Sequence, residues 1–462
     1  MKKLIAIVLI PLLLLAGSCT KYLECDDCVT DPNNPSITTA AMLLTIGQVA
    51  TFSTFEGKMT RLPQIFTQHL AGTDFQYYEF ANFNITDSDF ENEWNQIYAD
   101  CQINMKLLID EFGAENPWYR GMAKIIQAMN LGITTDNWGD IPWREALQGT
   151  ENLNPHYDSQ EFIYSTIQSL LSEAIEDLSE PAEANKLFPG LDDLIYGGDP
   201  EAWIRIAWVL KARYANHLSK LNPANSASDA INYLNQAYAA GFASPANDMN
   251  AVHGEAGNEL NQWYAFEQNR ANYLKMGKPL VDLMLAKNDP RLSYYAALDD
   301  NGGYSGTEAG DNDVSTSSVG PYFASPTSSF PLVTYVEAKF IEAEAKLRLG
   351  EGGDAASAHN EAIKAHVRQV TGADDPVFYA AEASETGATI TLDKIMTHKY
   401  IAMFLQNEVW VDWRRTGIPS LSGPGGKEIP RRLVTPIGEN ANNVNSPKIG
   451  SLYTPRLWWD TP

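Results

Sequence analysis

The sequence predicts a mainly α-helical protein built from pairs of helices, with long irregular loops and a few short β-hairpins. Apolar residues recur at steps of three or four through much of the chain, which is the spacing of one helix face. Long stretches without this pattern separate the helical segments, and loops of such length inside a compact domain are usually functional. Strand-like runs are short, and the sequence Asn301-Gly302-Gly303 is typical of a turn.

Helical periodicity defines the elements in order along the chain. The segment 200–220 shows the reasoning, because Asp199 can cap its first turn and Pro200 stands where a missing N–H costs nothing. An apolar stripe then runs from Trp203 to Tyr214. The predicted helices lie at 39–55, 58–70, 90–112, 117–135, 159–179, 200–220, 227–240, 334–349, 354–370 and 392–415.

The segments 334–349 and 354–370 form the clearest helix pair. A glycine-rich turn at 350–353 joins them, and alanines line up on both helices. Small residues let two helices approach closely, so the pair resembles a tetratricopeptide unit. One pair does not prove an array of such units, although the helices at 90–135 and 159–220 could supply others. We predict one domain at 36–462 that no linker divides.

The first residues indicate export. Lys2 and Lys3 precede an apolar run at 4–15 that is too short to span a bilayer comfortably. Small residues then lead to Cys19, a pattern that resembles a bacterial lipobox. We predict a signal peptide at 1–18, lipidation of Cys19 and a tether at 19–35; an ordinary signal peptide with a chance cysteine is the alternative. Cys25 and Cys28 in the tether could form a small local disulfide or stay as two inert thiols.

Composition excludes several classes of function. The chain holds 58 acidic and 33 basic residues, for a net charge of −25, and so acidic a surface would repel nucleic acid. Four cysteines are too few for a disulfide-built scaffold. Cys101 falls on a predicted helix, where we expect it to be buried.

Motifs of known enzymes are missing from the sequence. No His-Glu-x-x-His motif occurs, the segment 303–306 lacks the Gly-x-Ser-x-Gly spacing, and 423–427 is too short for a phosphate loop. Asp311-Asn312-Asp313 lacks the full spacing of a calcium loop. We therefore predict no catalysis, no metal and no cofactor, although a glycosidase could draw its two carboxylates from the many acids present.

Several short segments together carry a resemblance to the SusD/RagB family of outer-membrane nutrient-binding lipoproteins. They are 138–143 (WGDIPW), 145–147 (EAL), 193–199 (DLIYGGD), 288–292 (NDPRL), 331–338 (PLVTYVEA), 342–345 (EAEA), 407–410 (NEVW), 412–417 (DWRRTG), 429–433 (IPRRL) and 458–460 (WWD). Their order and spacing behind a lipobox extend the resemblance almost from Cys19 to the C-terminus. It implies a tetratricopeptide-like scaffold with a loop-built binding surface. It also implies a partner, a SusC-like TonB-dependent outer-membrane barrel that the lipoprotein caps as a lid.

These shared segments are expected to be structural. We predict that Trp138 and its neighbours pack a turn between helices, with Asp140 bonding backbone amides, rather than forming a sugar platform. Asp412, Arg414 and Arg415 are expected to form a buried charge network that holds the last helix, the alternative being a clamp for phosphate or carboxylate.

Two loop segments combine aromatic rings with amides or carboxylates, as sugar recognition requires. The ligand-binding candidates are Asp74, Gln76, Tyr77, Tyr78, Asn261, Trp263 and Tyr264. We expect Tyr77, Tyr78 and Trp263 to lie on one surface, away from the helix pair at 334–370. The alternative is that these rings pin the loops to the helical body. A peptide ligand would suit the same surface.

The sequence as a whole predicts a cell-surface, lipid-anchored outer-membrane protein. It would capture oligosaccharides or oligopeptides and pass them to the barrel. Two alternatives remain, a surface glycan-degrading enzyme and an assembly partner of the barrel that binds no ligand.

Overall fold

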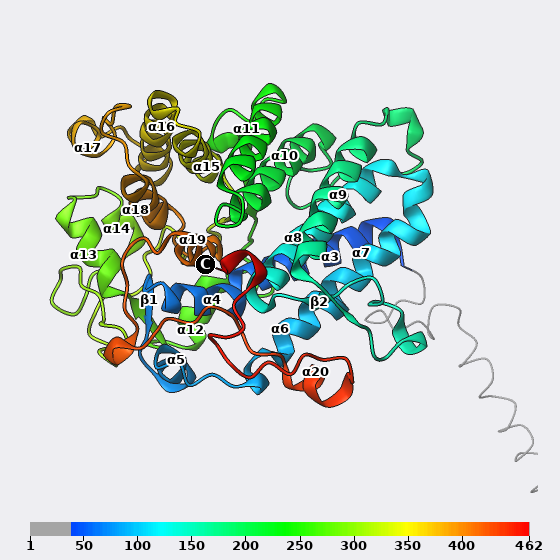
Figure 1. The fold of residues 1–462 in the computed structure, drawn as a ribbon, viewed down its shortest axis with the longest axis horizontal. Coiled ribbons are helices and arrows are strands. Elements are labelled where there is room, and N and C mark those ends of the chain that lie inside the picture. The colour runs from blue at the N-terminus through cyan, green and yellow to red at the C-terminus, as the bar shows by residue number, and fades with distance from the viewer. Residues whose placement is uncertain (1–37, 462) are drawn as a thin grey trace, which may run out of the picture.

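The computed structural model describes residues 38–461, and the fold is seen in Figure 1. The predicted signal peptide, the lipidation of Cys19, the tether and the state of Cys25 and Cys28 lie outside the described residues. Within the described part of the chain, no helix is long and apolar enough to cross a membrane.

A curved array of helix pairs forms the body of the molecule and confirms the mainly α fold. Helix α8 packs on α9, α10 on α11 and α15 on α16, and further contacts join α9 to α10 and α11 to α15. Figure 1 shows the array passing from α3 and α7 through α8 to α11 and on to α15 and α16. Its long helices are α3 (Ala40–Glu56), α8 (Pro117–Trp138), α9 (Gln160–Leu178), α10 (Pro200–His217), α11 (Pro223–Ala239), α15 (Tyr335–Arg348) and α16 (Gly352–Thr371).

The predicted helix at 90–112 is one helical run with two wider turns. It consists of α6 (Glu91–Asn95), a π-helical stretch at Gln96–Gln102, α7 (Ile103–Leu107) and a second π-helical stretch at Leu108–Phe112. Cys101 on this run is a buried free thiol, as expected, and burial raises its pKa to about 12.

Small residues allow the close contacts of the array. The alanines of α15 and α16 that face each other are buried. A Cβ atom at Gly121 of α8 would lie 2.6 Å from Cγ of Leu178 on α9, and one at Gly132 would lie 2.0 Å from the hydroxyl of Tyr214 on α10. Glycine is therefore the residue that lets α8 approach both neighbours.

The remaining helices are shorter and surround the array. They are α4 (Lys58–Phe66), α5 (Phe75–Ala81), α12 (Gln262–Asn269), α13 (Lys278–Ala286), α14 (Leu292–Tyr295), α17 (Pro376–Glu382), α18 (Leu392–Ala402), α19 (Glu408–Thr416) and α20 (Ile437–Asn442). Short 3₁₀ turns occur at Asp87–Phe90, Gly113–Glu115, Gly149–Glu151, Ala182–Ala184, Pro245–Asn247, Pro424–Gly426 and Trp458–Asp460. The helices α5 and α12 lie outside every helix that the sequence predicted.

The prediction of one helix at 392–415 is wrong, because the chain turns between α18 and α19. Leu405 takes a left-handed conformation there, with φ of 62°. Gln64 of α4 holds this turn from outside: its Oε1 accepts from the backbone N–H of Leu405 and its Nε2 donates to the carbonyl of Gln406, both at 2.8 Å. A contact with a residue more than three hundred positions away cannot be read from helical periodicity.

The strands are as short as predicted, but they do not form hairpins. The described residues contain three two-stranded antiparallel sheets. Their strands are β1 (Leu70–Gly72) with β5 (Leu274–Met276), β2 (Ile141–Pro142) with β3 (Tyr157–Asp158), and β4 (Met249–Ala251) with β6 (Phe330–Val333). In each sheet the connection is far longer than a hairpin loop.

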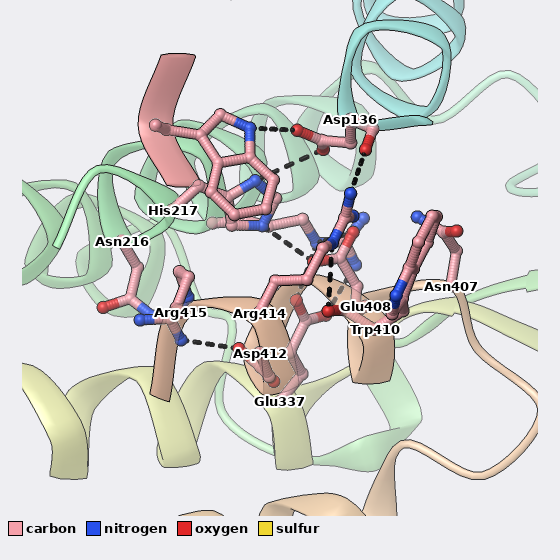
Figure 2. Close-up of polar contacts among 12 residues, drawn as sticks. Asp136, Asn216, His217, Glu337, Asn407, Glu408, Trp410, Asp412, Arg414 and Arg415 are labelled. Carbon is pink, nitrogen blue, oxygen red and sulfur yellow. Dashed lines mark hydrogen bonds and ion pairs between the residues drawn. The ribbon is translucent and has the colours of Figure 1, made fainter. Parts of the chain in front are cut away.

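A buried charge network fastens α19 to the array, which confirms the structural reading of Asp412, Arg414 and Arg415 (Figure 2). Arg415 donates to both carboxylate oxygens of Glu344, at 2.7 and 3.0 Å, and to Asp412 at 2.6 Å. Arg414 donates to the carbonyl of Asp136 at 2.7 Å and lies over the ring of Trp410. Every one of these groups is buried, so the network holds helices together and presents nothing to a ligand.

His217 lies at the centre of this network. Its Nε2 is 2.7 Å from Glu408 and its Nδ1 is 3.3 Å from Asp136. Burial by itself would lower the pKa of His217, but the two carboxylates outweigh that effect and raise the pKa to about 9. We therefore expect His217 to carry a positive charge at neutral pH, which its two carboxylate neighbours favour.

The turn after α8 is also structural, as predicted. Trp138 is buried and its indole N–H donates to the carbonyl of Val434 at 2.8 Å. Asp140 accepts from the backbone N–H of Gln160 at 2.8 Å and so caps the start of α9. Packing and hydrogen bonding within the chain therefore account for both residues without a sugar platform.

Candidate ligand-binding site

A cavity of about 700 Å³ opens between four short helices, α4, α5, α6 and α12. These four helices lie in the lower half of Figure 1, whereas α15 and α16 lie at the upper edge. The lining is mostly polar. It comprises Lys58, Arg61, Gln76, Tyr77, Asn92, Glu93, Gln262, Ala265, Phe266, Asn269 and Arg270.

The β1–β5 ladder explains how two distant segments come to share this cavity. Strand β1 runs directly into α5, and β5 follows α12. The ladder pairs Leu70 with Met276 and Gly72 with Leu274, and it is extended by a bond from the N–H of Thr73. The rings of Tyr77 and Phe266 consequently pack edge to face, with centroids 5.2 Å apart.

The polar candidates at the starts of these helices are caps. Asp74 accepts from the backbone N–H of Phe75 at 2.9 Å and begins α5. Asn261 is buried and begins α12, where it accepts from the backbone N–H groups of Trp263 and Tyr264, both at 2.9 Å. Its amide also donates to the carbonyl of Ser328. The hydrogen bonds of both side chains therefore account for their presence without a ligand.

The expectation that Tyr77 and Trp263 offer free ring faces is wrong. Their side chains are 1% and 0% exposed, because each stands on the inner face of a short helix rather than in an open loop. Tyr77 contributes only a wall of the cavity. Tyr78 and Tyr264 are partly exposed but lie outside the lining. Gln76 is the candidate that is both exposed and part of the lining.

An accessible aromatic ring is instead supplied by Phe75, at the start of α5 beside Gln76. Its side chain is 67% exposed. The ring stacks on Tyr273, with centroids 5.0 Å apart and planes 25° from parallel. One face of Phe75 is thus supported by Tyr273, and the other is available to a flat or ring-shaped ligand.

Three cationic side chains line the cavity. Lys58 is paired with Glu93 at 3.2 Å. The guanidinium of Arg61 lies 4.2 Å from the centroid of Phe266 and 5.4 Å from that of Trp263. Arg270 lies 5.8 Å from the centroids of both Phe266 and Tyr273. Phe266 is therefore the ring that orients both arginines.

Two carboxylates lie beneath this region without forming an ion pair with Arg61. Burial raises the pKa of Glu267 to about 7, although Lys275 and Arg61 act in the opposite direction. Burial also raises the pKa of Glu56, which the neighbouring His253 partly offsets at a distance of 3.0 Å. One oxygen of each carboxylate is buried without a hydrogen-bond partner among residues 38–461.

Sequence reasoning found the two segments but missed most of the lining. It did not single out Lys58, Arg61, Asn92, Glu93, Phe266, Asn269 and Arg270. Lysine and arginine on an amphipathic helix usually mark a solvated face, so the pattern at 58–66 contains no signal for a cavity. Across the described residues, no three His, Cys, Asp or Glu side chains are grouped so that they could hold a metal ion.

Comparison with known proteins places the chain in a family. Residues 32–436 match the SusD-like family whose description is "starch-binding associating with outer membrane". The match spans most of the chain, so the protein belongs to the SusD-like family, within the SusD/RagB class of proteins. A comparison with curated protein sequences finds no match.

Solved structures share the fold at low sequence identity. A SusD/RagB family protein from Bacteroides thetaiotaomicron is 22% identical, with a TM-score of 0.77, over 92% of this chain and 99% of the other. A chitin-binding SusD homologue from Flavobacterium johnsoniae is 20% identical, with a TM-score of 0.75, over 90% and 98%. A SusD homologue from Bacteroides fragilis is 21% identical, with a TM-score of 0.74, over 92% and 100%.

Proposed function

We propose that this protein is a surface glycan-binding lipoprotein that takes up oligosaccharides in the α4–α5–α6–α12 cavity and delivers them to a SusC-like TonB-dependent barrel. The observation that carries the proposal is the cavity itself, on a chain of the SusD-like family. Amides of Gln76, Asn92 and Asn269 can exchange hydrogen bonds with sugar hydroxyls. Phe75, which precedes Gln76 in the chain and is not part of the lining, offers an exposed ring face. The family description and the chitin-binding relative support a saccharide over an oligopeptide.

The lining favours binding over glycan hydrolysis. Glycosidases usually place two carboxyl groups about 5–10 Å apart across the scissile bond. Glu93 is the one carboxylate among the lining residues, and it is ion-paired with Lys58. A single carboxylate cannot supply both of the carboxyl groups that such a reaction needs.

Calorimetric titration of the purified protein with a panel of oligosaccharides tests the binding function. We expect one or more glycans to bind and to be recovered unchanged, and Gln76→Ala to weaken the interaction without altering the melting curve. Products released from a bound glycan would favour the alternative that this protein is a glycan-degrading enzyme. Absence of binding to every glycan, together with co-purification of a barrel, would favour the pure assembly partner.

Anchoring and partner are tested in cells. Cys19→Ala should release the protein from the outer membrane in a strain that lacks the barrel, because no helix of the described residues can hold it there. Intact cells that express the unaltered protein should stain with antibody, and the barrel should co-purify in detergent. Staining only after lysis would contradict the surface location, and a Cys19→Ala protein that resists a salt wash would contradict the lipid anchor.

A further inference from the structure

The arginines of the cavity differ from the other arginines of the molecule. Among residues 38–461, Arg61 and Arg270 are the arginines whose guanidinium groups form neither an ion pair nor a hydrogen bond. Elsewhere the guanidinium group binds a carboxylate, as in Arg213 with Glu337, or backbone carbonyls, as in Arg414. Both exceptions line the same cavity.

The side chains of Arg61 and Arg270 pack against neighbouring aromatic rings. Arg61 is half-buried and its Nε is shielded from solvent without a partner. Both guanidinium groups lie against Phe266, and Arg270 also lies against Tyr273. A guanidinium stacked on a ring keeps the N–H groups at its edge free, and that edge matches a carboxylate or sulfate.

The charges of the lining residues also favour an anionic ligand. Its lining contains Lys58, Arg61 and Arg270 but Glu93 alone as an acid, on a chain whose net charge is −25. Glu267 and Glu56 lie nearby, but neither is within ion-pairing distance of Arg61, and burial raises the pKa of both. The lining therefore carries more positively than negatively charged side chains, in a cavity that also holds amides and open volume.

We infer that the cavity is built for an anionic oligosaccharide, with Arg61 and Arg270 binding a carboxylate or sulfate group on the sugar. This inference rests on the proposed function and narrows its class of ligand. A neutral glycan would leave both guanidinium groups without an anion. A uronate or a sulfate ester would supply the missing charge and, for a planar carboxylate, a two-pronged hydrogen bond.

Titration of the full-length lipoprotein in detergent with three probes tests the inference. The probes are chito-oligosaccharide (neutral), oligogalacturonide (carboxylate) and a chondroitin sulfate oligosaccharide (carboxylate and sulfate). We expect one or both acidic probes to bind more tightly than the neutral one and to weaken as salt rises. Arg61→Met and Arg270→Met should each lower affinity for the acidic probe by about tenfold to a hundredfold, as expected for loss of a charge-assisted hydrogen bond.

A matched control separates local contact from overall charge. Arg368→Met on α16 removes one exposed positive charge far from the cavity, and we expect it to leave affinity unchanged. Arg270→Lys keeps the charge but not the planar guanidinium edge. Its affinity for the acidic probe should therefore lie between that of Arg270→Met and that of the unaltered protein.

The outcomes distinguish this inference from the proposed function. Equal or tighter binding of the neutral probe at the cavity would overturn the anionic class while the glycan-binding function stands. Unchanged affinity in both Arg61→Met and Arg270→Met would also overturn the inference. No binding of either acidic probe would overturn the inference, and no binding of any glycan of the wider panel would overturn the proposed function as well. Tighter binding of a glutamate-rich peptide than of every saccharide would replace the glycan by an acidic peptide.

Discussion

Arginine side chains have different environments in two regions of this molecule. In the network around α19, Arg213 and Arg415 are fully buried and each binds a carboxylate through two N–H groups. In the cavity between α4 and α12, Arg61 and Arg270 stack on aromatic rings and bind no anion of the described chain. A charge without a partner is very costly in a dry interior but tolerable beside solvent. The pairing state thus separates arginines that hold the fold from arginines that can receive a ligand.

The largest expected effect is on the buried side of this comparison. Arg213→Met leaves Glu337 buried without its partner, which should lower the free energy of unfolding by about 3–5 kcal/mol. Arg270→Met, the same substitution at the exposed arginine, should change it by less than about 1 kcal/mol. Chemical denaturation of both variants measures the difference. Similar losses in the two variants would remove the distinction between the regions.

Trp263 should behave as a core residue, although the sequence suggested a ligand platform. Trp263→Ala removes a side chain that is 0% exposed, so we expect a loss of about 3–5 kcal/mol of stability, measured by denaturant titration. Trp263→Phe keeps most of the volume and should cost much less. A Trp263→Ala variant with unaltered stability but weakened glycan binding would restore the sequence-based reading.

The pH dependence of stability tests the charge of His217. Its folded pKa is raised to about 9 from an ordinary value of 6.5, so its contribution is fully present below pH 6.5 and is lost as the pH rises to about 9. The stability difference between the unaltered protein and His217→Gln should therefore be largest near pH 6 and shrink by about 1–3 kcal/mol towards pH 9. Thermal unfolding from pH 5 to 10 measures it.

The measurement compares the stability of the unaltered protein with that of His217→Gln because other groups titrate in the same pH range. Burial raises the pKa of Asp248 to about 7 and lowers that of Lys211 to about 8. Both groups are present in the variant as well, so their contributions cancel. A difference that stays constant with pH would show that folding does not shift the pKa of His217, and one that grows as the pH rises from 5 to 7 would show that folding lowers it.

The parts of the structure that follow from local sequence could be predicted, and those that depend on distant contacts could not. The helix pair α15–α16 and the capped start of α10 are encoded within short windows, and they lie where the sequence placed them. The break between α18 and α19 depends on Gln64, and the assembly of the cavity depends on the three-residue strands β1 and β5. Neither contact produces a periodic pattern in the amino-acid sequence.

The candidate site shows the same limit at the level of single side chains. The segments beginning at Asp74 and Asn261 do come together, but each forms a helix of one or two turns. Which ring then faces inward depends on where that helix begins. In α5, the turn buries Tyr77 and exposes Phe75, and the sequence cannot distinguish the two because both are aromatic and adjacent to Gln76.

The smallest expected effect concerns Phe75, the exposed counterpart of Trp263. Phe75→Ala should leave the melting curve unchanged, because the ring is largely exposed and packs on Tyr273 alone among the aromatic side chains. If a sugar stacks on its free face, the loss is on the order of 1 kcal/mol, or about tenfold or less in affinity. Calorimetry with the tightest-binding saccharide of the three probes measures this change. Phe188→Ala, at a ring 54% exposed and remote from the cavity, is the matched control and should bind as the unaltered protein does. Equal affinities of the two variants would mean that the ligand contacts the arginines and amides but not the ring of Phe75.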